Sequence, residues 1–179
     1  MRKSWMQAVV WFVTGTVWLA GQAADPAAVR TLLDGAGIPP TATQRGQLDT
    51  VGFVTTAAQM DAVLAQATAL AAPRNAELAA RHGWGADTAF AAAVCPHDDY
   101  FYAARLYALA LPRIQARRVI LFGVFHKARV FGCRDRLVFD RYAAWRGPYG
   151  PVPVSTLRDA LLARLPAADV AVNNDMHMA

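Results

Sequence analysis

Two short apolar runs flank a helical segment near the middle of the chain, and this order constrains the fold more than any other feature. Residues 90–95 form the first run, which ends at Pro96-His97, and residues 118–124 form the second. Between them, residues 100–111 carry apolar side chains at helical spacing. Short apolar runs are typical of buried strands, and a strand–helix–strand order favours a right-handed crossover between parallel strands. We therefore expect an α/β fold with a mostly parallel sheet flanked by helices.

The part of the chain before this unit has a helical pattern. Asp25-Pro26 is a typical helix start, with Asp25 as the N-cap, and Gly35 follows the apolar face of that helix. A longer helix is expected over about 56–72, where Pro73 should stop it. Residues 74–81 can add a short helix.

The part after the unit contains one more helix and one more strand. Ser155 can cap a helix that runs to about Arg164, and residues 168–172 predict a third strand. Residues 173–179 have the pattern of a loop that leaves this strand, not of a terminal helix. We therefore expect the chain to be an N-terminal fragment of a longer protein.

The first residues resemble a secretory signal peptide. Two basic residues begin the segment, an apolar stretch covers residues 5–19, and Gly21 and Ala23 are the small residues expected before a cleavage site. The apolar stretch is short for a membrane span, which favours cleavage over a membrane anchor. The sequence predicts a secreted or periplasmic protein that contacts a membrane only through an uncleaved signal segment. The expected organisation is a signal peptide over 1–23, a helical region over 24–89 and the front part of an α/β domain over 90–179.

Composition and charge narrow the classes of function. The chain is 55% hydrophobic and 17% charged, which is apolar enough to fill a core and excludes intrinsic disorder. Its formal net charge is +5, and many basic residues fall between positions 113 and 136. These residues lack the interleaved aromatics or the binding motif of a nucleic-acid surface, so we expect no nucleic-acid partner. A solvated face is the simplest explanation of the charge, and an anionic substrate is the alternative.

A histidine follows each of the three predicted strands. His97 follows the first strand, His126 the second and His177 the third. Ligands of parallel α/β sheets bind beyond the carboxyl ends of the strands, so these imidazoles should meet at one mouth of the sheet. Each histidine taken alone is also explained as a surface or hydrogen-bonded loop residue.

Carboxylates accompany these histidines. Asp98 and Asp99 follow His97 directly, and Asp175 lies beside His177. Two imidazoles and one carboxylate are typical ligands of non-haem iron. Asp98 and Asp99 can instead be solvated turn residues, and the sequence does not decide between these roles. Tyr100 and Tyr102 can line a pocket, although packing on the surface of the helix explains them equally simply.

Four segments resemble a known family. Val94-Cys95-Pro96-His97-Asp98-Asp99-Tyr100 is similar to the Pro-His-Ala-Gly-Tyr motif of the Memo-like proteins, also called AmmeMemoRadiSam system protein B. Leu121-Phe122-Gly123-Val124-Phe125-His126-Lys127 is similar to a strand followed by the family's Gly-Pro-Ser-His-His. The stretch 145–154 resembles the family's Thr-Pro-Leu-Gly loop, and Asp175-x-His177 resembles the segment before its Glu-His-Ser motif. The resemblance covers roughly residues 90–179.

This resemblance implies both a fold and a metal site. The fold would be that of the class III extradiol dioxygenases (LigB/Memo-like), truncated at the C-terminus, and His97 and His126 would correspond to metal-ligand histidines. The family's third ligand, a late cysteine, would lie beyond Ala179. The chain departs from the motifs because Asp98-Asp99 replaces Ala-Gly and Lys127 replaces the second histidine of the pair.

The sequence therefore predicts a Memo-like metal-binding protein that uses a divalent transition metal, iron or copper. The expected metal ligands are His97, His126 and Asp98. The candidate catalytic residues are His177, as a general acid/base, and Asp99. The catalytic form is a dioxygenase-like oxidoreductase that acts on a small molecule outside the cytoplasm. The alternatives are a non-catalytic metal- or partner-binding protein of the same fold, and a plain α/β domain whose histidines are incidental.

Overall fold

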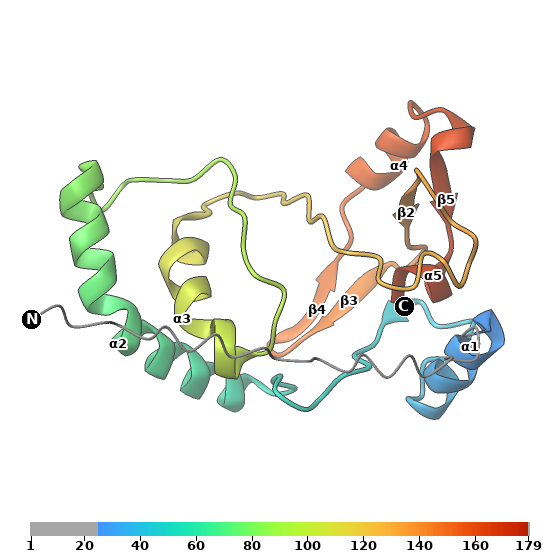
Figure 1. Cartoon of the computed structure of the whole chain (residues 1–179), viewed down its shortest axis with the longest axis horizontal. Coiled ribbons are helices and arrows are strands. Elements are labelled where there is room, and N and C mark those ends of the chain that lie inside the picture. The colour runs from blue at the N-terminus through green and yellow to red at the C-terminus, as the bar shows by residue number, and fades with distance from the viewer. Residues whose placement is uncertain (1–24, 179) are drawn as a thin grey trace, which may run out of the picture.

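The computed structural model describes residues 25–178 and contains helices and two small sheets. The predicted α/β class is confirmed, but the sheets are short and mixed instead of forming one mostly parallel sheet. Figure 1 shows helices α2 (Ala57–His82) and α3 (Tyr100–Ala110) at one end of the molecule, and the two-stranded sheet with α1 (Pro26–Gly35) toward the other. The signal peptide expected over 1–23 lies outside the described residues.

The larger sheet has three strands and joins distant parts of the chain. Strand β1 (Gln44–Arg45) pairs in parallel with β3 (Ala144–Gly147), which pairs antiparallel with β4 (Gly150–Pro153). The register places Arg45 opposite Trp145. This pairing fixes the position of Arg45 beside a region of the chain about 100 residues later.

The smaller sheet contains the third strand that the sequence predicted. Strand β5 (Val170–Val172) pairs in parallel with β2 (Leu137–Phe139). The chain between these two strands forms β3 and β4 of the larger sheet, then helix α4 (Leu157–Leu162) and the 3₁₀ turn η2 (Ala167–Asp169). The Ser155 hydroxyl accepts a hydrogen bond from Leu157 N at 3.2 Å at the start of α4, but the N-cap is the next residue, Thr156, whose side chain makes no capping hydrogen bond.

Helix α1 begins where its sequence predicted. The Asp25 carboxylate accepts a hydrogen bond from Ala27 N at 3.0 Å, and Pro26 occupies the first helical turn, where its missing N–H costs nothing. The core of this half of the molecule lies between α1, the strands and the C-terminal helix α5 (Asn174–Met178). Its buried members are Val29, Leu33, Ile38, Tyr142 and Met178.

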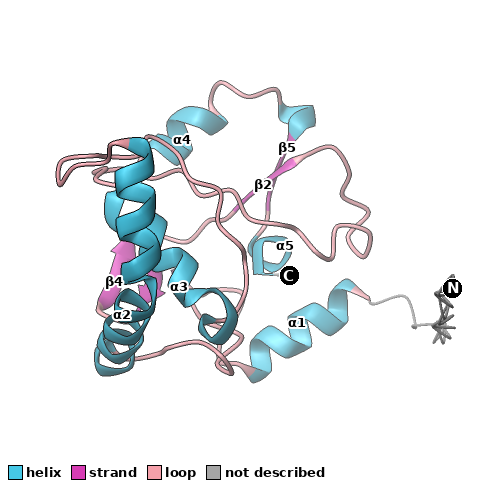
Figure 2. Cartoon of the chain, turned by 60° about the vertical axis from the view of Figure 1, so that its left-hand side comes forward, coloured by secondary structure: helices cyan, strands magenta, loops and turns pink. Residues whose placement is uncertain are grey.

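Helix α2 is longer than predicted. Thr56 and Gln59 form a capping box at its start, and Gly83, with φ of 67°, ends it. The prediction that Pro73 stops the helix is wrong, because α2 continues through this residue. Alanine, the strongest helix former, is frequent around the proline. Ala67 and Ala71 are also buried on the side of α2 that packs against α3, and this packing offsets the backbone hydrogen bond that Pro73 cannot make. Figure 2 shows the two helices side by side.

The two predicted strands that flank α3 are not strands in the structure. Residues 90–95 and 118–124 are irregular and belong to neither sheet. Most of their apolar side chains are exposed, with Phe122 at 80% and Val94 fully accessible, whereas Phe90 and Cys95 are half-buried. An apolar segment can be buried, but its composition does not supply another strand to pair with. Helix α3 packs against α2 instead of forming the crossover between two neighbouring strands.

The end of the described chain is also different from the prediction. Residues 174–178 form helix α5 instead of a loop, because the Asn173 side chain accepts a hydrogen bond from Met176 N at 3.0 Å and Met178 packs into the core. In the described part of the chain, no helix is both long and apolar enough to cross a membrane.

Candidate functional site

The structure brings His97 and His126 together. Their ring centroids are 5.1 Å apart and the ring planes are inclined by 33°. Each ring lies on an irregular segment directly after one of the two apolar runs, and both residues are exposed. We call these two residues the histidine pair. The pair therefore forms although the runs that carry it do not join a sheet.

Hydrogen bonds of the Tyr107 hydroxyl hold the backbone on the His97 side. The Tyr107 hydroxyl, from the last turns of α3, lies 2.6 Å from Pro96 O and accepts a hydrogen bond from Asp98 N at 3.1 Å. These contacts bracket His97 on both sides. Tyr107 is thus a positioning residue. The sequence pattern of residues 100–111 indicated only that this position belongs to an apolar face of a helix.

Asp98 and Asp99 are both engaged in local structure. The Asp99 carboxylate caps α3 by accepting a hydrogen bond from Tyr102 N at 3.3 Å. Asp98 Oδ1 accepts a hydrogen bond from Asp99 N at 2.8 Å. Across residues 25–178, no group of three or more His, Cys, Asp or Glu side chains is arranged to hold a metal ion. The structure therefore places Asp98 beside His97 in sequence without adding its carboxylate to the histidine pair.

His126 lies at the start of a compact turn. Phe125 O accepts a hydrogen bond from Ala128 N, and the Phe125 and Phe131 rings pack with centroids 5.8 Å apart. Cys133 N donates to Ala128 O at 2.9 Å, which closes the turn, and Cys133 is a buried free thiol. This packing anchors the segment that presents the His126 ring.

His177 occupies a different environment from the histidine pair. Its ring packs against Trp145, with centroids 5.4 Å apart, and its Nε2 lies 3.8 Å from Asp140 Oδ2. Its Nδ1 is buried and has no hydrogen-bond partner. Burial lowers the pKa of His177, Asp140 opposes this shift, and the positive charge of Arg45 adds to it. The side chain is therefore held in an environment that favours neutral imidazole.

Asp140 is the centre of a buried polar group of residues next to His177. Only 4% of Asp140 is exposed, and its carboxylate accepts hydrogen bonds from Arg158 Nη1 at 2.8 Å and Trp145 Nε1 at 2.6 Å. We call Asp140, Trp145, Arg158 and His177 the Asp140 cluster. Sequence reasoning identified only His177 in it. The position of Asp140 immediately after an apolar run, residues 137–139, is the signal that could have indicated a strand-end carboxylate.

Comparison of the chain with family models, with curated proteins and with solved structures gave no match in any of the three.

Proposed function

We propose that this chain is a Memo-like metal-binding protein that binds a divalent transition metal, iron or copper, through His97 and His126. The observation that carries the proposal is the 5.1 Å separation of the two ring centroids. The extradiol-dioxygenase-like fold suggested by the sequence motifs is part of the same proposal.

The separation of the rings is compatible with shared coordination. A metal–nitrogen distance of about 2.0–2.1 Å places an imidazole centroid roughly 3.2 Å from the ion, so two ligands at a roughly tetrahedral angle have centroids about 5 Å apart. The observed value agrees with this distance. Both histidines are exposed, so an ion can reach them without opening the core.

The surrounding residues support the pair in different ways. Tyr107 fixes the backbone around His97, and the turn closed by Cys133 fixes the backbone that follows His126. Asp98 and Asp99 follow His97 directly in the sequence and add two formal negative charges to this segment, which favours a cation. Two imidazoles leave coordination positions for other ligands, and an iron or copper ion with open positions supplies oxygen and redox chemistry.

In the catalytic form of the proposal, the protein is a dioxygenase-like oxidoreductase acting on a small molecule. Asp99 is a candidate catalytic residue by its position two residues after His97, and its carboxylate caps α3 in the structure. His177 is the candidate general acid/base. Its Nδ1 is buried and has no hydrogen-bond partner, so this nitrogen is available to accept a proton. The alternative is a non-catalytic protein that only holds the metal or a partner. The separate location of the Asp140 cluster favours this alternative.

Metal titration tests the binding proposal. The full chain, titrated with Cu²⁺ or anaerobic Fe²⁺ in a calorimeter, should bind one ion, and His97→Ala or His126→Ala should weaken binding by about tenfold or more. His82→Ala is the matched control, because His82 is an exposed histidine stacked on Trp84 elsewhere in the molecule. Unchanged affinity in both His97→Ala and His126→Ala would overturn the proposal.

Oxygen uptake separates the two forms. A metal-loaded protein that consumes oxygen with catechols, and loses this activity in His97→Ala, is an oxidoreductase. A protein that binds the ion without oxygen uptake is the non-catalytic form.

N-terminal sequencing of exported material tests the accompanying proposal of a secreted or periplasmic location, because cleavage after Ala23 predicts a mature chain that begins at Ala24.

A further inference from the structure

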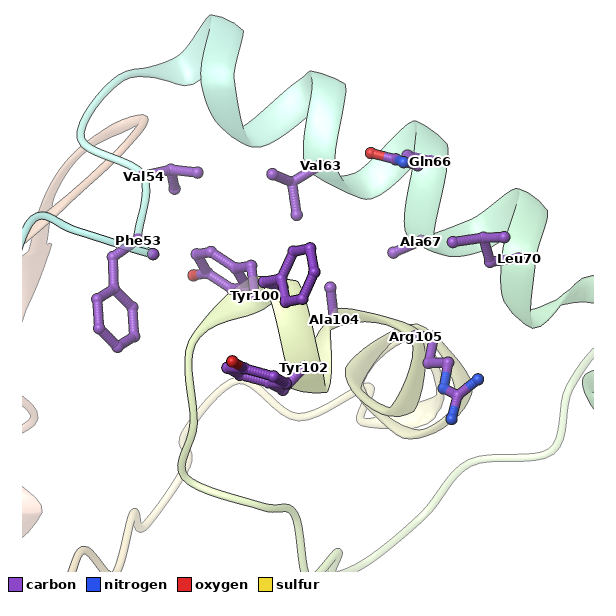
Figure 3. Close-up of a pocket in the computed structure, with 12 residues that line it drawn as sticks. Phe53, Val54, Val63, Gln66, Ala67, Leu70, Tyr100, Tyr102, Ala104 and Arg105 are labelled. Atoms are coloured by element: carbon purple, nitrogen blue, oxygen red, sulfur yellow. The ribbon is translucent and has the colours of Figure 1, made fainter.

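A groove runs between helices α2 and α3. It has a volume of about 640 Å³, and most of its lining residues are apolar, although Gln66 and Arg105 also line it. These residues come from both helices and from the segment before α2. Figure 3 shows Val63, Ala67 and Leu70 of α2 facing Tyr100 and Ala104 of α3 across this space. Leu70 is 64% exposed and Phe101 is 87% exposed. Apolar side chains gathered in an open groove are typical of a binding surface.

A second, smaller hollow adjoins the groove. Its volume is about 350 Å³, and it shares Phe53, Val54 and Tyr100 with the groove. Its remaining lining is more polar and includes two cations, Arg45 and Arg146, against the single carboxylate of Asp49. The groove and the hollow meet at these three shared residues. The groove itself also carries Gln66 and Arg105, so the two linings together hold three arginines against one carboxylate.

Arg45 lacks the partner that a half-buried cation normally has. Its guanidinium lies over the Trp145 ring, 4.7 Å from the centroid, and its Nε is buried without a hydrogen-bond partner. Among residues 25–178, no carboxylate lies within ion-pair distance of Arg45. The nearby Asp140 carboxylate binds Arg158 and Trp145 instead. Burial lowers the pKa of Arg45, as expected for a desolvated cation. Cations in such positions are usually paired, so the site is suited to an external anion.

We propose that this surface binds a fatty acid, with the carboxylate at Arg45 and Arg146 and the hydrocarbon chain along the groove between α2 and α3. The planar fork of an arginine matches a carboxylate, and the excess of arginines over carboxylates in the two linings favours an anion. The apolar side chains of the groove, among them Phe53, Val63 and Leu70, can contact a hydrocarbon chain. Neither His97 nor His126 lines the groove or the hollow, so this site is independent of the metal proposal.

Calorimetric titration of the full chain with dodecanoate, below its micelle concentration, tests the proposal. Dodecanoate should bind, whereas dodecyltrimethylammonium, with the same chain and a positive head, and butyrate, with the same head and a short chain, should bind at least about tenfold more weakly. Equal affinity for dodecanoate and dodecyltrimethylammonium, or no binding of dodecanoate, would overturn the proposal.

Matched variants locate the head and the chain. Arg45→Gln should weaken dodecanoate binding by about tenfold or more, whereas Arg164→Gln, at an exposed arginine outside the hollow, should not change it. Leu70→Glu should weaken binding, whereas Leu64→Glu, at an exposed leucine of α2 outside the groove, should not. If Arg45→Gln unfolds the chain, the exposed Arg146→Gln decides, and unchanged binding in that variant contradicts the proposal.

Discussion

Arg158 and Asp140 form an ion pair at 2.8 Å, although Asp140 is only 4% exposed. The same Arg158 Nη1 also donates to Tyr142 O at 2.7 Å, so one guanidinium connects α4 to the segment between the two sheets. Trp145 of β3 donates the second hydrogen bond to the carboxylate. The Asp140 cluster therefore joins β3, α4 and α5 to the segment after β2, and its carboxylate has partners that compensate for burial.

Removal of the Asp140 carboxylate should destabilise the protein strongly. Asp140→Ala leaves Arg158 partly buried beside an empty space, and breaking such a pair typically costs about 3–5 kcal/mol. Asp159→Ala is the control, because Asp159 pairs with the same arginine at 3.2 Å but is 69% exposed, and exposed pairs contribute about 0–1 kcal/mol. The measurement is the free energy of unfolding in urea. Equal losses in the two variants would contradict a special role for the buried pair.

Acidification should destabilise the chain through His177. Burial lowers the pKa of His177 below its ordinary value of 6.5, so below pH 6.5 the unfolded chain binds more protons than the folded chain at this residue. The stability from neutral His177 is complete above pH 6.5 and is lost as the pH falls through the folded-state pKa. The free energy of unfolding, measured from pH 8 to pH 5, should therefore decrease more steeply in the natural chain than in His177→Gln.

A second histidine variant controls for the other groups that titrate in this range. His82→Gln removes an exposed imidazole that stacks on Trp84, and it serves as the control for the loss of an imidazole as such. A His177→Gln profile parallel to that of the natural chain would show that the folded structure does not perturb this histidine.

Gly52 should be intolerant of a side chain. Its φ is 79°, and a Cβ at this position would lie 2.5 Å from the Cβ of Asp99 and 2.7 Å from Asp99 Oδ2. Gly52→Ala would strain the backbone and displace the carboxylate that caps α3, with a combined cost of about 1–3 kcal/mol. Gly85→Ala, where a Cβ has nothing within 4 Å, should change the free energy of unfolding much less. Thermal unfolding followed by circular dichroism compares the two variants, and equal melting temperatures would contradict the close contact between Gly52 and Asp99.

Local chemistry explains which elements the sequence predicted. Asp25 and Ser155 accept hydrogen bonds from residues two positions later, so the sequence alone indicates where their helices begin. Strand β5 follows from a short run rich in valine and alanine. The end of α2 could not be predicted in this way, because the effect of Pro73 depends on packing against α3, which is a long-range contact.

Long-range pairing explains what the sequence did not predict. The Asp140 cluster combines residues from β3, the loop after β2, α4 and α5, and no local spacing relates Asp140 to Arg158 and His177. His97 and His126 were grouped from their positions after two apolar runs, and the structure places their rings together by a different backbone path. The sequence therefore grouped two side chains that the structure does bring together, but it placed them on strands that the structure does not contain.

The exposed run 118–124 gives a direct test of the difference between sequence pattern and structure. Phe122 is 80% exposed, so Phe122→Ala should change the free energy of unfolding by no more than about 0.5 kcal/mol. A buried strand at this position would instead predict a loss of about 3–5 kcal/mol. Tyr142→Ala supplies the reference for a buried aromatic residue, because Tyr142 is 1% exposed and packs against α1 and α5 in the core. Urea unfolding of both variants measures the two losses side by side. A loss in Phe122→Ala as large as that in Tyr142→Ala would mean that residues 118–124 are buried in solution, as the sequence pattern predicts.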